Sequence, residues 1–90
     1  MQTTTRYIDS SKSTPDWRLY GTLGCHLCDE AEILLQQAQA VADFSFEKVD
    51  IADFPEAQMR QFADKIPVLV TPQKTLFYPF SLMDIVALTQ

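Results

Sequence analysis

Both glycines, both cysteines and the only histidine of this 90-residue chain lie within eight residues, from Gly21 to Cys28. Glycine adopts the backbone conformations of tight turns more readily than any other residue. After Cys28 the chain contains no Gly, Cys or His. The chain therefore has one place for a glycine-shaped turn, and we expect its function to depend on the nucleophilic side chains held there.

Length and charge limit the class of protein. Ninety residues allow one small domain, and 47% hydrophobic with 21% charged residues indicates a folded chain rather than a disordered one. No apolar run approaches the ~20 residues that span a bilayer. Residues 16–90 carry 5 basic and 11 acidic side chains, a net charge of −6. This excess of acid disfavours binding to nucleic acid or to an anionic membrane surface.

The first residues lack the apolar stretch of a secretory signal, so we expect a cytoplasmic protein. Residues 1–15 are rich in Thr and Ser and predict a flexible tail, followed by one domain over residues 16–90. In a reducing compartment, two cysteines three residues apart indicate redox or metal chemistry rather than a structural disulfide.

Hydrophobic periodicity predicts an α/β domain in the order β-α-β-α-β-β-α. The strand-helix-strand unit is expected to be parallel and right-handed, and the last two strands to form an antiparallel hairpin. Together they give a four-stranded mixed sheet flanked by helices. The predicted strands are Trp17–Tyr20, Phe44–Ile51, Pro67–Thr71 and Thr75–Tyr78, and the predicted helices are Cys25–Ala42, Asp53–Ile66 and a last one that follows Ser81.

Two helix starts carry capping signals. Asp53 with Glu56, and Ser81 with Asp84, have the spacing of a capping box. The core is expected to contain the apolar stripe of the first helix and most phenylalanines. The expected core residues are Leu27, Ala31, Leu34, Leu35, Ala38, Val41, Ala42, Phe44, Phe46, Phe62 and Phe77.

The cysteine pair stands between the first strand and the first helix. Unpaired N–H groups at a helix N-terminus stabilise a thiolate, so we expect a lowered pKa for the Cys25 thiol. Cys28 lies one turn further on, on the inner side. Protonated His26 would favour the thiolate, whereas the acidic Asp29 and its neighbours oppose it. The pattern predicts Cys25 as the attacking thiol and Cys28 as the resolving thiol.

Other interpretations of the pair remain open. Two cysteines supply half the ligands of a structural zinc site, and His26 is poorly placed to add a third, so no metal site is predicted. Metal binding would need a second subunit or a small-molecule thiol. Two buried, inert cysteines are the remaining alternative.

Two residues outside the cysteine segment are candidates for the site. Pro67 begins a predicted strand, although proline has no N–H to donate to a neighbouring strand. A cis Ile66–Pro67 bond would make this position acceptable. Tyr20 lies close to the cysteines in sequence, and it could line a substrate cleft or simply pack.

Four segments spread over Trp17 to Leu88 point to a known family. They are Leu19-Tyr20, Gly24-Cys25-His26-Leu27-Cys28, Val49-Asp50-Ile51 and Ile66-Pro67-Val68. In these segments the chain resembles the glutaredoxin-like branch of the thioredoxin superfamily. The resemblance implies the thioredoxin-like fold, Cys25 as nucleophile and a cis Pro67 beside it. The candidate substrate-binding residues are then Tyr20, Gly24, Ile66 and Pro67.

The chain also departs from glutaredoxins. Thr22 replaces their usual lysine, His26-Leu27 replaces Pro-Tyr or Pro-Phe, and Tyr78-Pro79-Phe80 occupies the region of a Gly-Gly turn that approaches glutathione. The resemblance implies glutathione as a possible reductant, but these departures fall at positions where glutaredoxins bind glutathione. The reductant, glutathione or a reductase, is left open.

The sequence therefore predicts a small monomeric dithiol oxidoreductase without a bound cofactor. Its expected partners are protein or small-molecule disulfides and an unidentified reductant. The alternative is a binding or adaptor module with the same fold and no efficient turnover, or a protein that binds metal through its thiolates.

Overall fold

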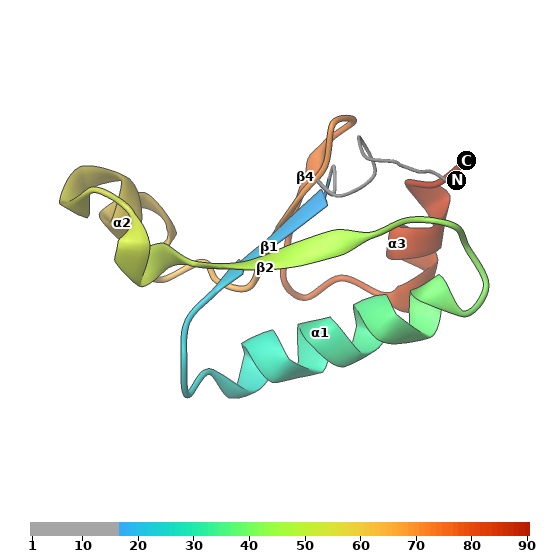
Figure 1. Cartoon of the computed structure of the whole chain (residues 1–90), viewed down its shortest axis with the longest axis horizontal. Helices are drawn as coiled ribbons and strands as arrows, with labels where there is room; N and C mark the ends of the chain where they lie inside the picture. Colours follow the sequence, from blue (N-terminus) through green and yellow to red (C-terminus); the bar gives the residue numbers. More distant parts are fainter. Residues whose placement is uncertain (1–16) are drawn as a thin grey trace, which may run out of the picture.

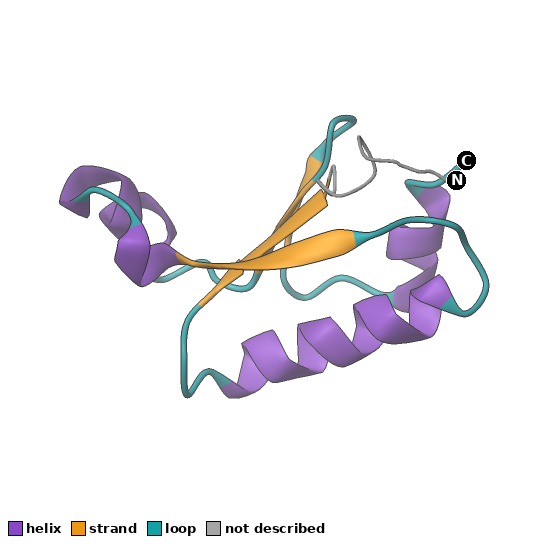
Figure 2. Cartoon of the chain, viewed as in Figure 1, coloured by secondary structure: helices purple, strands orange, loops and turns teal. Residues whose placement is uncertain are grey.

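Four strands form one mixed sheet in the spatial order β2-β1-β3-β4. The computed structural model describes residues 17–90, and the tail predicted for residues 1–15 lies outside the described residues. The arrangement confirms the predicted α/β, thioredoxin-like fold (Figures 1 and 2). The elements are β1 (Trp17–Gly21), α1 (His26–Gln39), β2 (Phe46–Asp50), a 3-10 turn η3 (Ile51–Asp53), α2 (Glu56–Phe62), β3 (Val68–Val70), β4 (Thr75–Phe77) and α3 (Leu82–Ala87).

The strand register decides which side chains meet on each face. β1 runs parallel to β2 and antiparallel to β3, and β3 runs antiparallel to β4. Leu19, Leu69 and Leu76 stand in one row across the three strands. Because neighbouring residues of a strand point to opposite faces, the next row lies on the other face of the sheet. That row contains Tyr20, Val68 and Phe77.

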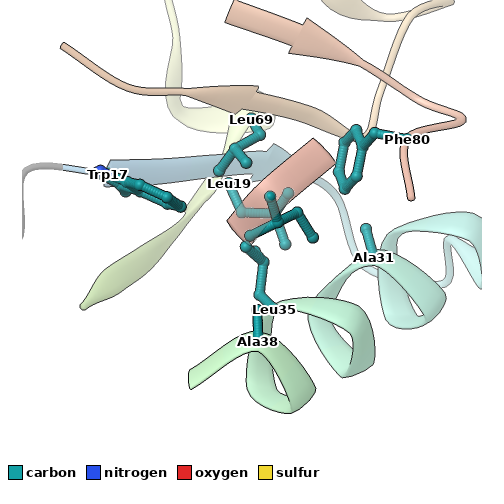
Figure 3. Packing of buried hydrophobic residues seen from close by; sticks show 8 residues of the cluster. Trp17, Leu19, Ala31, Leu35, Ala38, Leu69 and Phe80 are labelled. Atoms are coloured by element: carbon teal, nitrogen blue, oxygen red, sulfur yellow. The ribbon is translucent and has the colours of Figure 1, made fainter. Parts of the chain in front are cut away.

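The core lies between the Leu19 face of the sheet and two helices. Figure 1 shows α1 and α3 on one side of the sheet, and α2 beyond its end, away from both. Leu35 and Ile85 are fully buried, one from each of the two covering helices. Figure 3 shows Leu35 reaching from α1 toward the sheet, with Trp17 at one side of the cluster and Phe80 at the other. Among residues 17–90, no helix is long and apolar enough to cross a bilayer.

The buried stripe of α1 differs from the predicted one. The helix buries Cys28, Ala31, Leu35 and Ala38, whereas Leu27 and Val41 are 48% and 70% exposed. The prediction that these two residues belong to the core is therefore wrong. Cys28 takes the inward position, and its neighbour Leu27 is turned about 100° away from it. Val41 lies beyond the helix, which ends earlier than predicted.

The start of α2 also differs from the prediction. α2 begins at Glu56 after Pro55, which makes no side-chain capping bond, and Asp53 lies in the preceding turn η3. The capping box predicted at Asp53 is therefore wrong. Asp50 is the residue that caps, since its Oδ1 accepts a hydrogen bond of 2.9 Å from the N–H of Ala52. In α3, by contrast, the predicted capping box of Ser81 and Asp84 is confirmed.

The aromatic residues divide between the two faces. Phe44 and Phe46 pack against the core as predicted, and the ring of Trp17 stacks on Phe44 at 4.3 Å. Phe77 is 52% exposed, so its prediction as a core residue is wrong. Its neighbour Leu76 has the core-facing position in β4, and the alternation of the strand turns Phe77 to the other face.

The packing predicts a large difference between two aliphatic residues of α1. Leu35→Ala should lower the free energy of unfolding by about 2–5 kcal/mol, because a fully buried side chain leaves a cavity. Ile33→Ala, in the same helix but 53% exposed, is the control and should change it by less than about 1 kcal/mol. Denaturant unfolding measures both. Equal losses in the two variants would contradict the placement of the core.

Candidate functional site

A four-residue turn joins β1 to α1 and ends in the first cysteine. Gly24 has a φ of +76°, a left-handed conformation that favours glycine. Cys25 follows in an extended conformation as the N-cap of α1. Its Sγ accepts a hydrogen bond of 3.1 Å from the backbone N–H of Cys28. A sulfur atom therefore occupies the capping position that is usually taken by a side-chain oxygen.

The two cysteines form a disulfide but differ in exposure. Their Cα atoms are 5.2 Å apart. Cys25 is half-buried, whereas only 8% of Cys28 is exposed. Cys28 packs against Gly21, where an added Cβ would lie 3.0 Å from its Sγ and 3.2 Å from its Cβ. Incoming groups therefore reach the pair more easily at Cys25 than at Cys28.

The segment before β3 approaches the cysteines from the other side. The Ile66–Pro67 peptide bond is cis, as the family resemblance implies. Pro67 is fully buried, and its carbonyl oxygen accepts a 3.2 Å hydrogen bond from the N–H of Tyr78. Ile66 and Leu27 line one pocket of about 350 Å³, here called the proline-side pocket. Its other lining residues are Asp64, Lys65, Phe77 and Tyr78.

A second pocket, of about 260 Å³, lies beneath the cysteine turn and is here called the strand-side pocket. Gly21, Gly24 and Cys28 line it, together with charged side chains from α1 and β2. Lys48 Nζ lies 3.2 Å from Glu32 Oε1, so these two charges are paired. The remaining charged lining residues are Asp29 and Asp50.

Tyr78 links the proline segment to the cysteine helix. Its hydroxyl donates a 2.9 Å hydrogen bond to Oε1 of Glu30, two residues after Cys28. That hydrogen bond, together with desolvation and the negative charge of Glu30, raises the pKa of Tyr78 above its ordinary value. The contact holds the chain after β4 against α1.

The predicted site residues do not all meet. Gly24 lines the strand-side pocket and Ile66 the proline-side pocket, while His26 is exposed at the first position of α1. Tyr20 lines neither pocket. Its ring packs edge-on against Phe54 and Phe62, each at 5.1 Å.

Two apolar site residues could not be recognised from the sequence by their hydrophobicity, which is equally typical of core positions. Leu27 and Phe77 are both about half exposed and both line the proline-side pocket. A signal for Leu27 was present: once Cys28 faces inward, the residue before it cannot share the buried stripe. For the described residues 17–90, no group of three His, Cys, Asp or Glu side chains could hold a metal ion.

Comparison with known proteins gives one family and two structural relatives. A family model described as a glutaredoxin-like domain (DUF836) matches residues 18–87. The crystal structure of target protein XcR50 from X. campestris is 34% identical, with a TM-score of 0.68, over 80% of this chain and 92% of that one. The solution structure of protein Ne2328 from Nitrosomonas europaea is 31% identical, with a TM-score of 0.69, over 86% and 94%. No curated protein matches the chain.

The contact of Gly21 with Cys28 predicts that the two positions are coupled. Gly21→Ala should destabilise the reduced protein by about 1–3 kcal/mol through crowding, and by clearly less when Cys28 is alanine. Gly24→Ala is the control, because its cost of about 1–2 kcal/mol comes from the backbone and no atom lies within 4 Å of its Cβ. For each glycine, denaturant unfolding of the parent protein, the glycine variant, Cys28→Ala and the double variant measures the coupling. Equal coupling for both glycines would contradict the packing described.

The hydrogen bond of Tyr78 predicts a pH effect. Glu30→Gln should lower the pKa of Tyr78 toward its ordinary value, because the acceptor loses its charge. Alkaline difference absorbance measures it, with Glu32→Gln as the control. A raised pKa in the folded state means that this bond stabilises the fold fully below the ordinary tyrosine pKa. That stabilisation disappears as pH rises through the raised value. An unchanged titration in Glu30→Gln would count against the bond.

Proposed function

Because the chain belongs to the glutaredoxin-like domain family (DUF836), we propose that it is a small thiol-disulfide oxidoreductase in which Cys25 attacks and Cys28 resolves. One observation carries the proposal: the half-buried Cys25 caps the helix while its disulfide partner Cys28 is buried. The two sulfurs thus differ in access and in hydrogen bonding. These are the properties that distinguish an attacking thiol from a resolving one.

The first step of the proposed cycle depends on the N-terminus of α1. In the reduced protein, the Cys28 N–H and the partial positive charge of the helix end stabilise a negative charge on the Cys25 sulfur. The thiolate attacks one sulfur of a substrate disulfide, the substrate S–S bond breaks, and one substrate thiolate leaves and takes up a proton. The product is a mixed disulfide at Cys25. Exposed His26 is proposed to tune the thiolate.

The second step uses the buried cysteine. Cys28 loses its proton and attacks the Cys25 sulfur of the mixed disulfide, and the second substrate thiolate leaves. Cys28 is held close by its position one helical turn after Cys25, with a Cα–Cα distance of 5.2 Å. The substrate has gained two electrons, and the protein has become the Cys25–Cys28 disulfide that the structure contains.

The proline-side pocket is the proposed surface for the apolar part of a substrate. Leu27, Ile66 and Phe77 come from three different segments and line it together. Exposed apolar side chains of this size at one pocket are typical of binding surfaces. Pro67, which directly follows Ile66, is fully buried.

The reductant of the protein disulfide is part of the proposal. The segment Tyr78-Pro79-Phe80 contains no glycine, and the Tyr78 hydroxyl is hydrogen-bonded to Glu30. Its backbone is therefore less accessible to glutathione than a glycine turn would be. We expect glutathione to be a poorer reductant than a thioredoxin-reductase system. Side-by-side reduction assays at equal reducing capacity test this.

A binding or adaptor role without turnover is the second candidate. Half-exposed Leu27 and Phe77 beside the cysteines favour it, since a partner could dock there without exchange. Stoichiometric metal in protein purified under reducing conditions would support a thiolate metal-binding role. A metal-free dithiol that oxidises and reduces reversibly would support the enzyme.

Two serine variants test the assignment of roles. With hydroxyethyl disulfide as substrate, Cys28→Ser should accumulate a mixed disulfide at Cys25, because the resolving thiol is gone. Cys25→Ser should lose turnover by at least about a hundredfold, since a hydroxyl does not replace the thiolate. Mass spectrometry locates the adduct, and a coupled assay gives the rate.

The matched controls are the wild type and the double serine variant. An adduct on Cys28 in Cys25→Ser that forms as fast as that on Cys25 in Cys28→Ser would reverse the roles. A wild-type protein as inactive as Cys25→Ser with every reductant would overturn the enzyme proposal.

A further inference from the structure

We propose that the strand-side pocket selects disulfides that carry a basic group close to the sulfur, and that it disfavours anionic ones. This inference rests on the proposed function, because it concerns the substrate class of the same cysteine pair. It starts from two separate observations. The pocket contains an excess of carboxylates, and Cys28, one half of the disulfide, lines it.

The charges in the pocket do not cancel. Asp29, Glu32 and Asp50 line it together with a single ammonium group, that of Lys48. Lys48 is paired with Glu32 at 3.2 Å. Asp50 is not paired with a cation in the pocket. Its Oδ1 accepts a hydrogen bond from the neutral backbone N–H of Ala52. Asp29 is exposed on the first turn of α1. Two carboxylates therefore remain without a cationic partner among the residues that line the pocket.

The opposite side of the cysteines has a different character. In the proline-side pocket, Lys65 lies 3.4 Å from Asp64, so the charged lining residues of that pocket cancel. The remaining lining residues are apolar or, like Tyr78, aromatic. The two pockets thus differ in charge. A substrate with a basic arm is directed to the strand-side pocket, and an apolar arm to the proline-side pocket.

The basic residues elsewhere do not offset this excess. Arg18 is paired with Glu47, and Arg60 with Glu56. Within residues 17–90, the basic side chains outside such pairs are His26 and Lys74, and Lys74 lies in the turn between β3 and β4. An anionic disulfide therefore finds no free lysine or arginine at the strand-side pocket.

The position of the pocket makes its charge relevant to the reaction. Gly24, which precedes Cys25, and the resolving residue Cys28 both line it. Cys25 lines neither pocket itself, but it directly follows Gly24 and is bonded to Cys28, so a group on its sulfur starts next to the strand-side pocket. At about 260 Å³ the pocket is below the usual range of drug-sized sites, so a short arm such as an aminoethyl group suits it.

The chemistry is the exchange already described, and its balance is complete. The reduced protein gives two electrons to the amine disulfide, two aminothiols leave with two protons, and the Cys25–Cys28 disulfide forms. The basic group stays attached to the leaving sulfur and takes no part in bond changes. Its attraction to Asp29 and Asp50 raises the local concentration of substrate and is screened by salt.

Single-turnover oxidation of the reduced full-length protein tests the inference. The substrates are cystamine, hydroxyethyl disulfide and dithiodipropionate, which are cationic, neutral and anionic. Each rate is divided by the rate of the same disulfide with dithiothreitol, a neutral dithiol, which removes differences in intrinsic reactivity. We expect the normalised rate of cystamine to exceed that of dithiodipropionate by about tenfold at low salt, and the ratio to approach one at ~1 M salt.

Two matched variants locate the effect. Asp29→Asn should reduce the cation-to-anion ratio by about two- to threefold. Asp43→Asn removes the same charge beyond the far end of α1, whose last residue Gln39 lies about 15 Å along the helix from Asp29, and should leave the ratio unchanged. Because the ratio compares substrates within one protein, a general change in thiolate reactivity cancels.

A second substrate tests whether the pocket prefers the basic group of a protein disulfide or that of a small amine disulfide. The disulfide dimer of a blocked Lys-Cys peptide carries the same ammonium chemistry on a longer arm. A larger normalised rate than that of cystamine assigns the pocket to basic protein disulfides, and a smaller one assigns it to small amine disulfides.

The outcomes separate this inference from the proposed function. Equal normalised rates for the three small disulfides, or a faster anion, would overturn the charge selection and leave the oxidoreductase intact. A ratio that falls equally in Asp29→Asn and Asp43→Asn would overturn the role of the pocket. No exchange with any disulfide would overturn the proposed function itself.

Discussion

The contact between Cys28 and Gly21 is the constraint on which the rest of the site depends. Cys28 is the first buried residue of the α1 stripe, and its sulfur lies where any side chain at Gly21 would stand. This contact brings the start of the helix close to the end of β1. Because α1 begins so near the strand, the intervening turn must be short, and Gly24 completes it with a positive φ. Cys25 is thereby placed at the helix end, where its sulfur caps an N–H.

The same arrangement gives the cysteine pair two unlike sides. The inward position of Cys28 turns Leu27 outward, where it meets Ile66 and Phe77 in an apolar pocket. On the other side, the parallel pairing of β1 with β2 places Lys48 on the α1 face of the sheet, within reach of Glu32. The carboxylates of Asp29 and Asp50 line the same pocket as this pair. A packing contact at the backbone therefore leads to different chemical environments on the two flanks of one disulfide.

Much of the fold could be predicted because its signals are local. Alternation and helical periodicity gave the order of elements, and the spacing of Ser81 and Asp84 gave a cap that the structure contains. The errors occurred where a local pattern competed with packing. Asp53 has a good capping sequence, yet the chain turns first through η3, which Asp50 caps. Phe77 is as hydrophobic as a core residue, yet the pairing of Leu76 with Leu69 turns it to the other face.

The sequence by itself determined the place of the chemistry. With both glycines and both cysteines inside eight residues, a strand before them and an amphipathic helix after them, a dithiol at a helix N-terminus follows from local physics alone. The tertiary structure decided which apolar side chains stay exposed and which carboxylates lie unpaired beside the disulfide. These properties depend on contacts between residues far apart in the chain, because burial and charge pairing are set by register and helix docking rather than by neighbours in sequence.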